Sequence, residues 1–389
     1  MTKILLIIPA FKHGGTNKSL LNLLSFIGDE FDVSILALSH LGPYKNILNE
    51  KAKIIKKNIN LGLLFDDFGY IDFKKDNKKQ IVIKLLRKSY RKIFKMIIGQ
   101  KYREKILNKY IKKIENMNFD TVVAMQEGDA TNFTARIKGK KIAWIRCDYD
   151  EYYKVVKIDE SAVYKRFQSI ICVSEYTRKV FINRYPQLEA RCHSIHNMID
   201  YNKIINMSLE NIEEEKMFNT SFFTIVSIGR LCRIKQFDLI PFIADGLIKK
   251  GLSFIWYIIG DGEERIRINQ LIEKHNVEGK VVLLGEKDNP YPYIRLSDLV
   301  VVTSLSEACP NVINEAKILH IPVVTTNFGS ANEFIKDGVN GIITTRDNIV
   351  NDITNIIRSL NFYSNIKLNA RNFLYSNEVI IARIIDILK

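Results

Sequence analysis

Short, almost wholly apolar runs alternate with stretches of helical spacing through the first two hundred residues. The runs are Ile4–Pro9, Asp32–Leu38, Thr121–Met125, Lys141–Ile145, Ile170–Val173 and Ile195–Asp200. Runs of this length, rich in β-branched residues, are typical of parallel strands that are buried on both faces. The pattern predicts a doubly wound α/β domain over residues 1–200.

A second series of the same kind begins after a polar, acidic stretch at 201–219, which is expected to link two domains. Its strands are predicted at Phe222–Gly229, Phe254–Gly260, Val281–Gly285, Leu299–Thr303 and Pro322–Thr326. These runs predict a second α/β domain over 220–374. An amphipathic pattern over Asn377–Leu388 predicts a final helix within 375–389.

The composition is that of a globular protein long enough for two domains. The chain has 389 residues, of which 47% are hydrophobic and 26% charged, and this excludes disordered, collagen-like and disulfide-rich classes. No apolar run approaches the roughly 18 residues of a membrane span, and the seven residues Ile4–Ala10 are interpreted as a strand, not a signal peptide. Five scattered cysteines without CxxC spacing indicate neither a disulfide framework nor a zinc site, so a reducing cytoplasm is expected.

The net charge of +15 comes from one segment. Residues 74–113 contain 16 Lys and Arg against two acids, whereas the other 349 residues carry 42 basic and 41 acidic groups. Apolar residues recur at helical spacing through this segment, and the basic residues that fall mostly on the other side include Lys84, Arg87, Lys88, Arg91 and Lys95. We expect an insertion over 74–116 that contacts an anionic membrane through these five residues. The alternatives are a surface helix with a solvated lysine face and a nucleic-acid-binding arm.

Two glutamates separated by seven residues carry the most specific chemical signal. Glu307 and Glu315 flank Pro310, which is expected at the first position of a helix that follows a buried strand. Backbone amides at residues 311–313, including those of Asn311 and Val312, are then expected to form an anion site. One carboxylate can hold a sugar hydroxyl and the other a ribose, although two surface glutamates would give the same pattern.

Further polar groups follow the other predicted strands of the second domain. Arg230 and Lys235 follow the first of them, and this pair suits a diphosphate without a metal. Gly260-Asp261-Gly262 and Gly285-Glu286 end the next two. A diphosphate held by magnesium would call for an Asp-x-Asp motif with further acidic partners, and we identify none in the sequence. No metal and no cofactor are therefore expected.

Taken together, these motifs resemble the retaining GT-B glycosyltransferases of family 4, over nearly the whole chain and most strongly over 222–345. The resemblance implies two Rossmann-like domains facing a cleft, with the C-terminal helix crossing back to the first. It also implies roles for individual residues. Glu307 would contact the transferred sugar, and Glu315 would bind the donor ribose. Arg230 and Lys235 would bind the diphosphate, and Gly285 and Glu286 would meet the nucleobase. Gly14 and Gly15 would face the cleft in which donor and acceptor bind.

Three positions depart from the family pattern. Ala308-Cys309 follow the first glutamate in place of Gly and an aromatic residue, and His320-Ile321 stand where Gly usually precedes the Pro-Val-Val run. A His-Asp pair that often ends a central strand of the first domain is replaced by Cys147-Asp148, so that Asp148 or Arg146 would take over the polar contact. His13 is a further candidate acceptor-side group, because imidazole titrates near neutral pH; a capping or exposed loop histidine is the alternative.

The resemblance implies a metal-independent enzyme that moves a sugar from a nucleotide-diphosphate donor, most commonly a UDP-sugar, to a glycan or lipid-linked acceptor. A bacterial cell-surface polysaccharide pathway and a peripheral position at the inner face of the plasma membrane are expected. The other interpretations are a nucleotide-sugar epimerase on the same fold and a protein that binds nucleic acid or an anionic surface through residues 74–113. A dinucleotide oxidoreductase is disfavoured because Pro9–Gly15 is not GxGxxG.

Overall fold

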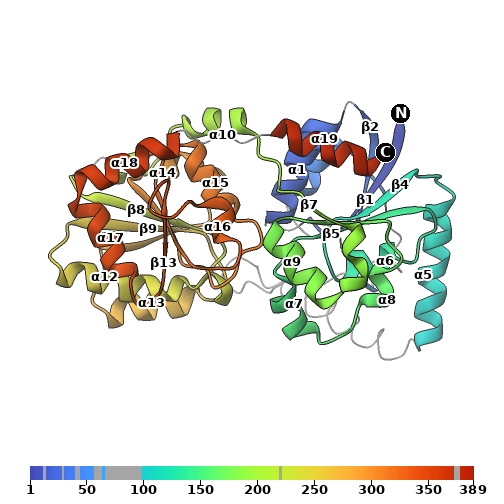
Figure 1. Cartoon of the computed structure of the whole chain (residues 1–389), viewed down its shortest axis with the longest axis horizontal. Helices are drawn as coiled ribbons and strands as arrows, with labels where there is room; N and C mark the ends of the chain where they lie inside the picture. The colour runs from blue at the N-terminus through green and yellow to red at the C-terminus, as the bar shows by residue number, and fades with distance from the viewer. Residues whose placement is uncertain are drawn as a thin grey trace, which may run out of the picture. The chain divides into compact units, whose positions relative to one another are not determined.

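The computed structural model describes residues 1–11, 15–28, 30–39, 44–56, 64–65, 99–218, 221–371 and 377–389. The chain divides into two compact units (Figure 1). Unit 1 contains Met1–Val173, Thr177–Met198 and Asn377–Lys389, and unit 2 contains Ser174–Tyr176 and Ile199–Ser376. Among the helices described, none combines the length and the apolar character that crossing a lipid bilayer requires.

Unit 1 is built on a parallel sheet, as the apolar runs predict. Its strands are β1 (Thr2–Ala10), β2 (Phe31–Ser39), β3 (Lys53–Ile54), β4 (Thr121–Ala124), β5 (Lys140–Ile145), β6 (Ser169–Cys172) and β7 (Cys192–Ser194). In the described part of the chain they lie in the order β3-β2-β1-β4-β5-β6-β7. Neighbours pair in parallel register, for example Ile4 with Val33 on one side and with Thr121 on the other. The order reverses between β1 and β4, as in doubly wound folds.

Helices bury the apolar faces of this sheet. They are α1 (Gly15–Ile27), α2 (Tyr44–Lys51), α5 (Gln100–Glu115), α6 (Asp129–Thr134), α7 (Tyr149–Val156), α8 (Ser161–Tyr164), α9 (Glu175–Arg184) and α19 (Asn377–Leu388). Leu5 and Ile7 of β1 pack in one cluster with Tyr110 and Ile114 of α5 and Phe133 of α6. The inward stripe of α5 therefore belongs to the core of unit 1, and its other residues are left for solvent.

The C-terminal helix α19 is part of unit 1, although the preceding chain belongs to unit 2. The Thr121 hydroxyl donates to the Leu388 carbonyl at 3.0 Å, and Lys389 pairs with Glu30 at 2.9 Å. Ile384 and Leu388 are fully buried. These contacts attach the end of the chain to the sheet of unit 1.

Unit 2 repeats the plan with a second parallel sheet. Its strands are β8 (Phe223–Ile228), β9 (Phe254–Ile259), β10 (Val281–Gly285), β11 (Leu299–Val302), β12 (Val323–Thr326) and β13 (Ile342–Thr344). In the described residues their order is β10-β9-β8-β11-β12-β13, which again reverses at its centre. The prediction of two doubly wound α/β domains is confirmed.

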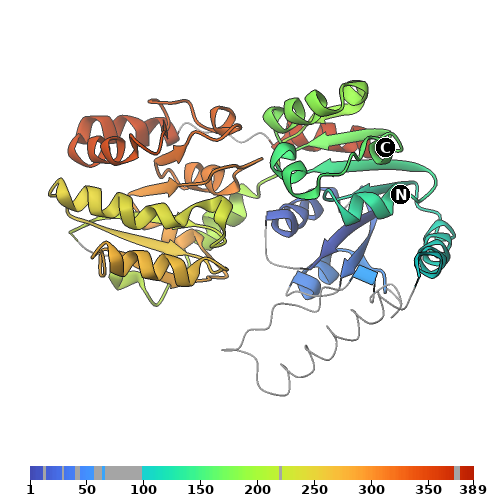
Figure 2. The ribbon, with the colours of Figure 1, turned by 90° about the horizontal axis from the view of Figure 1, so that it is seen from below.

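Both faces of this second sheet are covered by helices (Figures 1 and 2). Its helices are α10 (Tyr201–Ser208), α11 (Glu215–Phe218), α12 (Ile240–Lys249), α13 (Arg265–Lys274), α14 (Tyr291–Arg295), α15 (Asn311–Ile318), α16 (Ala331–Phe334), α17 (Ile349–Arg358) and α18 (Leu360–Arg371). Along β11, Leu299 and Val301 join the core under α12, α13 and α17, whereas Val300 and Val302 join the core under α10, α14 and α15. This alternation is the period of two that a strand imposes.

The structure differs from the sequence-based prediction between residues 192 and 219. The last strand of the first sheet is Cys192–Ser194, three residues ahead of the predicted run Ile195–Asp200. The segment 201–219, expected as a linker, instead contributes α10 and α11 to unit 2. Ile204 and Phe218 anchor these helices because each is buried in a core cluster of that unit. Ile205, Met207 and Ile212 pack beside them, so the apolar residues of this polar stretch dock it on unit 2.

Candidate functional site

The predicted site residues of unit 2 follow strands that end at the same edge of its sheet. Lys235 lies in the segment after β8, and Glu307 lies in the segment after β11. β8 and β11 are adjacent, and the strand order reverses between them. In open α/β sheets, ligands bind in the crevice at this reversal, beyond the carboxyl ends of the strands.

An ion pair joins these two segments at the reversal point. The Lys235 ammonium contacts the Glu307 carboxylate, and their side chains are only 26% and 12% exposed. The Ser304 hydroxyl donates to the same Glu307 oxygen at 2.8 Å. Thr303 donates from its hydroxyl to the Lys235 carbonyl at 2.8 Å, and Leu305 donates from its amide to the Ile234 carbonyl, also at 2.8 Å. Residues 72 positions apart are thus held as one polar centre, with an ammonium suited to phosphate and a carboxylate suited to hydroxyl groups.

Glycines allow the segments after β8 and β9 to meet backbone to backbone. A Cβ at Gly260, whose φ is +140°, would lie 1.9 Å from the Gly229 carbonyl oxygen. A Cβ at Gly262 would lie 2.3 Å from the Leu231 carbonyl oxygen. The Gly260 amide also donates to the Gly285 carbonyl at 2.8 Å, which connects the end of β10 to the same centre. Positions 260 and 262 therefore require glycine, because a side chain at either would collide with the backbone after β8.

Arg230 lies at this edge with most of its side chain in solvent. It pairs with Glu263 at 3.0 Å, and the two side chains are 72% and 54% exposed. A pair this exposed contributes little to stability, so the guanidinium is available to exchange partners. Glu286 follows Gly285 and is also exposed. Sequence reasoning missed Ser304 and Glu263, for which the only signals are a hydroxyl three residues before Glu307 and an acid close to the Gly260-Asp261-Gly262 turn.

The helix that carries Glu315 begins one residue later than predicted. Pro310 is the N-cap of α15, and the Ile313 amide donates to the Pro310 carbonyl at 3.1 Å. The amide of Ile313 is thus not available to an anion. Of the predicted anion site, this leaves the amides of Asn311 and Val312, the first two residues of the helix. Glu315 lies further along α15 and is buried, with 4% exposure.

A lysine is buried on the same helix. Lys317 is 3% exposed, and its ammonium donates to the Phe334 carbonyl at 2.7 Å. Burial disfavours the charged form and lowers the pKa of Lys317 to about 8 from an ordinary value of 10.5. The folded protein therefore binds fewer protons at this position than the unfolded chain between those two values.

Lys317→Met is expected to stabilise the protein at neutral pH and to lose this advantage in alkali. The wild-type free energy of unfolding should rise with pH between the folded and unfolded pKa values, because the unfolded state binds more protons there. The difference between variant and wild type should shrink by about 2–3 kcal/mol from neutral pH to about pH 10. Urea unfolding at both pH values measures it, with exposed Lys274→Met as the control. A difference that is equal at the two pH values would show that Lys317 titrates normally.

Unit 1 also has predicted site residues at the reversal point of its sheet. Gly15 begins α1, the first helix after β1, and the Thr16 hydroxyl donates to the Gln126 side chain, beyond β4, at 3.3 Å. A Cβ at Gly15 would meet no atom of the described residues within 4 Å. His13 and Gly14 lie outside the described residues.

The residues that stand in place of the His-Asp pair have structural partners. Asp148 is the N-cap of α7, and its carboxylate accepts from the Asp150 amide at 3.1 Å. Desolvation, followed by the charge of Glu127, raises the pKa of the Cys147 thiol well above its usual range. Cys147 therefore stays a neutral thiol and cannot reproduce an imidazole.

The Arg146 guanidinium lies in an internal network. It donates to the Met125 carbonyl at 2.8 Å and to Ser19 Oγ and Asn197 Oδ1, both at 2.9 Å. It also stacks on the Trp144 ring, 4.5 Å from the ring centroid. Arg146 thus ties α1 to the end of unit 1 just before the chain leaves it.

Within the residues that the structure describes, no group of three or more His, Cys, Asp or Glu side chains is placed to hold a metal ion.

One family model and several known proteins are similar in sequence to parts of this chain. Residues 209–373 match the family model described as "Glycosyl transferases group 1". An uncharacterized glycosyltransferase of Methanocaldococcus jannaschii is 30% identical over 197 residues, which are 48% of this chain and 48% of that protein. The N-acetylgalactosamine-N,N'-diacetylbacillosaminyl-diphospho-undecaprenol 4-alpha-N-acetylgalactosaminyltransferase of Campylobacter jejuni is 26% identical over 62% of this chain and 67% of its own length. The chain thus spans about half to two thirds of these two relatives.

Solved structures match over the whole chain. Alr3699/HepE of Anabaena, in complex with UDP-glucose, has a TM-score of 0.78 at 19% identity and covers 100% of this chain and 99% of its own. TarM of S. aureus, in a complex that contains UDP, has a TM-score of 0.71 at 16% identity, with both chains covered completely. This similarity establishes the two-domain fold of these structures for the present chain.

Proposed function

We propose that this chain, which has the GT-B fold, is a glycosyltransferase that transfers a hexosyl group from a nucleotide-diphosphate sugar. The observation that carries the proposal is the Lys235–Glu307 pair, a cation and a carboxylate at the strand-order reversal of unit 2. It lies within the 209–373 region that matches the glycosyl transferases group 1 model.

We propose that unit 2 binds the donor. Lys235 and the exposed Arg230 supply positive charge for a diphosphate, and buried Glu315 supplies a carboxylate for ribose hydroxyls. Gly285, the last residue of β10, and Glu286, which follows it, would meet the nucleobase. UDP is the proposed nucleotide, which is supported by the UDP and UDP-glucose complexes of the structural relative from Anabaena.

The proposed chemistry is retaining and metal-independent. When the sugar leaves, negative charge develops on the diphosphate, and the two cations at this sheet edge would stabilise it. Glu307 would accept a hydrogen bond from a hydroxyl of the transferred sugar and hold the reacting carbon in place. Retention is proposed as attack on the face from which the diphosphate departs, with no cofactor.

We propose a cell-surface glycan or a lipid-linked sugar as the acceptor, in a bacterial cell. The names of two relatives support a phosphate-bearing acceptor, since one enzyme acts on a diphospho-undecaprenol glycan and another on poly(ribitol-phosphate). The charge of Lys84, Arg87, Lys88, Arg91 and Lys95 supports a peripheral position at the inner face of the plasma membrane, although these residues lie outside the described part of the chain. A nucleic-acid-binding protein and an epimerase are not favoured by any relative reported above.

The function is tested with a panel of UDP-, GDP-, dTDP- and ADP-sugars, scored by calorimetric binding and by donor hydrolysis. One nucleotide should bind, and Glu315→Gln should weaken its binding roughly ten- to a hundredfold, because a hydrogen bond to a charged group contributes about 1.5–3 kcal/mol. Exposed Glu278→Gln is the matched control and should bind as wild type. If the wild-type protein binds and hydrolyses none of the donors, the proposed function is wrong.

A further inference from the structure

One face of α5 carries a stripe of lysines that the donor site does not use. Lys101, Lys105, Lys109 and Lys112 are all exposed on this helix. At 3.6 residues per turn they fall within about 80° of its circumference. The first three follow each other at steps of about 6 Å, and the four span about 16 Å along the axis. The charges therefore form a line.

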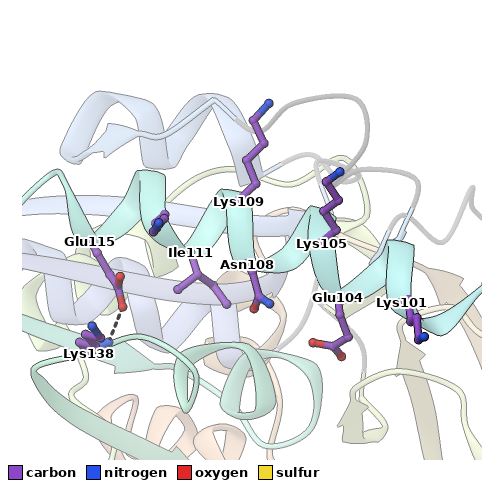
Figure 3. A pocket seen from close by; sticks show the side chains of 9 residues that line it. Lys101, Glu104, Lys105, Asn108, Lys109, Ile111, Glu115 and Lys138 are labelled. Carbon is purple, nitrogen blue, oxygen red and sulfur yellow. Dashed lines mark hydrogen bonds between the residues drawn. The ribbon is translucent and has the colours of Figure 1, made fainter.

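The stripe borders a shallow groove in unit 1 (Figure 3). The groove has a volume of about 760 Å³, and Lys138 approaches it from the chain beyond α6. Lys105 and Lys109 project to one side of α5, whereas Glu104, Asn108 and Ile111 project to the other, toward Lys138.

The acids of this groove already have partners. Glu104 binds Arg136 through two hydrogen bonds of 2.5 and 2.9 Å, and this contact lowers the pKa of Glu104. Glu115 accepts the Lys138 backbone amide at 3.0 Å. In contrast, among the described residues none forms a hydrogen bond or ion pair with the side chains of Lys101, Lys105, Lys109 or Lys112. The rim of the groove thus carries a row of lysines whose charges no described residue neutralises.

We propose that this groove binds a linear chain of sugar or alditol phosphates. Its row of point charges matches a ligand whose anionic groups repeat along a line, and an ammonium is a binder of phosphate. The guanidinium fork that would favour a carboxylate is that of Arg136, which Glu104 already occupies.

The surroundings of the stripe favour such a chain over a membrane or a nucleic acid. A membrane-binding helix presents apolar residues beside its basic ones. Of the described large hydrophobic residues of α5, only Tyr102 is exposed. Single-stranded nucleic acid is bound by stacking on aromatic rings, and the residues that line the groove include no aromatic side chain. A hollow lined by lysines fits a flexible polar chain.

The further step, that this chain is the sugar acceptor, rests on the proposed function. Binding to the groove does not rest on it, and it can be measured without any donor. A protein that hydrolyses no donor but binds the phosphate chain would contradict the proposed function and leave the groove assignment standing.

The test is a fluorescence anisotropy titration of a labelled glycerol-phosphate oligomer with the full chain at low salt. Replacing Lys101, Lys105, Lys109 and Lys112 together by Gln should weaken binding roughly tenfold or more. It should also reduce the slope of log affinity against log salt by about 3, because four counter-charges are no longer released. The control replaces Lys179, Lys203, Lys250 and Lys274 by Gln, which removes the same charge from other exposed positions. The control should keep wild-type affinity, and both variants should unfold at the wild-type temperature.

Competition separates the proposed ligand from three other polyanions. Unlabelled glycerol-phosphate oligomer should displace the probe. An oligogalacturonate of equal charge, an oligodeoxynucleotide and phosphatidylglycerol vesicles should each displace it poorly. Equal loss of affinity in the two quadruple variants, or none in the α5 variant, overturns the groove assignment. Stronger competition by vesicles, together with weaker vesicle binding by the α5 variant, would identify α5 as a membrane surface, and stronger competition by the oligodeoxynucleotide would identify a nucleic-acid site.

Discussion

Glu307→Gln is expected to lower sugar transfer by roughly 10²–10³-fold while leaving the affinity for the free nucleoside diphosphate near the wild-type value. Glutamine has the shape of glutamate but cannot pair with Lys235 as an anion or hold a sugar hydroxyl through a charged acceptor. An interaction that acts on charge developing in the transition state costs about 3–4 kcal/mol when removed. Because the nucleotide alone has no sugar for Glu307 to hold, this substitution should not weaken its binding, and release of Lys235 from the ion pair can only favour the diphosphate.

The measurement combines a transfer assay with calorimetric titration of UDP. Ser304→Ala is the graded control: it removes the 2.8 Å hydrogen bond to Glu307 and leaves the charge pair in place. A hydrogen bond to a charged group contributes about 1.5–3 kcal/mol, so this variant should lose roughly ten- to a hundredfold, less than Glu307→Gln. Glu307→Gln that transfers like wild type would remove Glu307 from the mechanism. Loss of UDP affinity in Glu307→Gln but not in Glu315→Gln would reverse the roles of the two carboxylates.

Gly260→Ala is expected to destabilise the protein by about 3–5 kcal/mol through unit 2. Its Cβ would lie 1.9 Å from the Gly229 carbonyl oxygen, and backbone at that position cannot yield as a flexible side chain can. The φ of +140° adds strain for any residue with a side chain. The segments after β8 and β9 would have to separate, which also loosens the segment that carries Lys235.

Denaturant unfolding measures this loss, and nucleotide binding at a low temperature measures its effect on the site. Gly99→Ala is the matched control, since its Cβ meets no atom of the described residues within 4 Å and its φ is −56°. Gly99 is the N-cap of α5, where Ala is less favourable than Gly, so the control should change the free energy of unfolding by no more than about 1 kcal/mol. If Gly260→Ala is as stable as Gly99→Ala, the segments after β8 and β9 do not pack as closely as the structure shows.

Most strands could be predicted from the sequence because they are apolar on both faces. The predicted runs Asp32–Leu38 and Val281–Gly285 correspond to β2 and β10 within one residue at each end. β3 and β13 were not predicted, and β7 begins three residues ahead of the run predicted for it; each has only two or three residues. All three lie at sheet edges, where a strand has one hydrogen-bonded neighbour and needs little apolar surface. Pairing, not composition, makes these segments strands.

Some side chains lie where their chemistry alone would not place them. A lysine is normally exposed, yet Lys317 is buried because α15 is enclosed by its neighbours and the Phe334 carbonyl accepts a hydrogen bond from its ammonium. Likewise, residues 201–208 lie in a stretch rich in polar residues, yet Ile204, Ile205 and Met207 pack on unit 2. In both cases contacts with distant parts of the chain outweigh the local pattern.

The sequence by itself determined the two α/β series, the glycines at the strand ends and the spacing of Glu307 and Glu315, because these depend on local periodicity and on conformations that particular residues permit. Only the tertiary structure decided that Lys235 meets Glu307, since that contact needs β8 and β11 to be neighbours although β9 and β10 lie between them in the chain. It also decided that the Glu104 charge is taken up by Arg136, while no described residue pairs with the side chains of Lys101, Lys105, Lys109 or Lys112. Charges are counted along a sequence, but they are neutralised in space, by whichever groups the fold brings within a few ångströms.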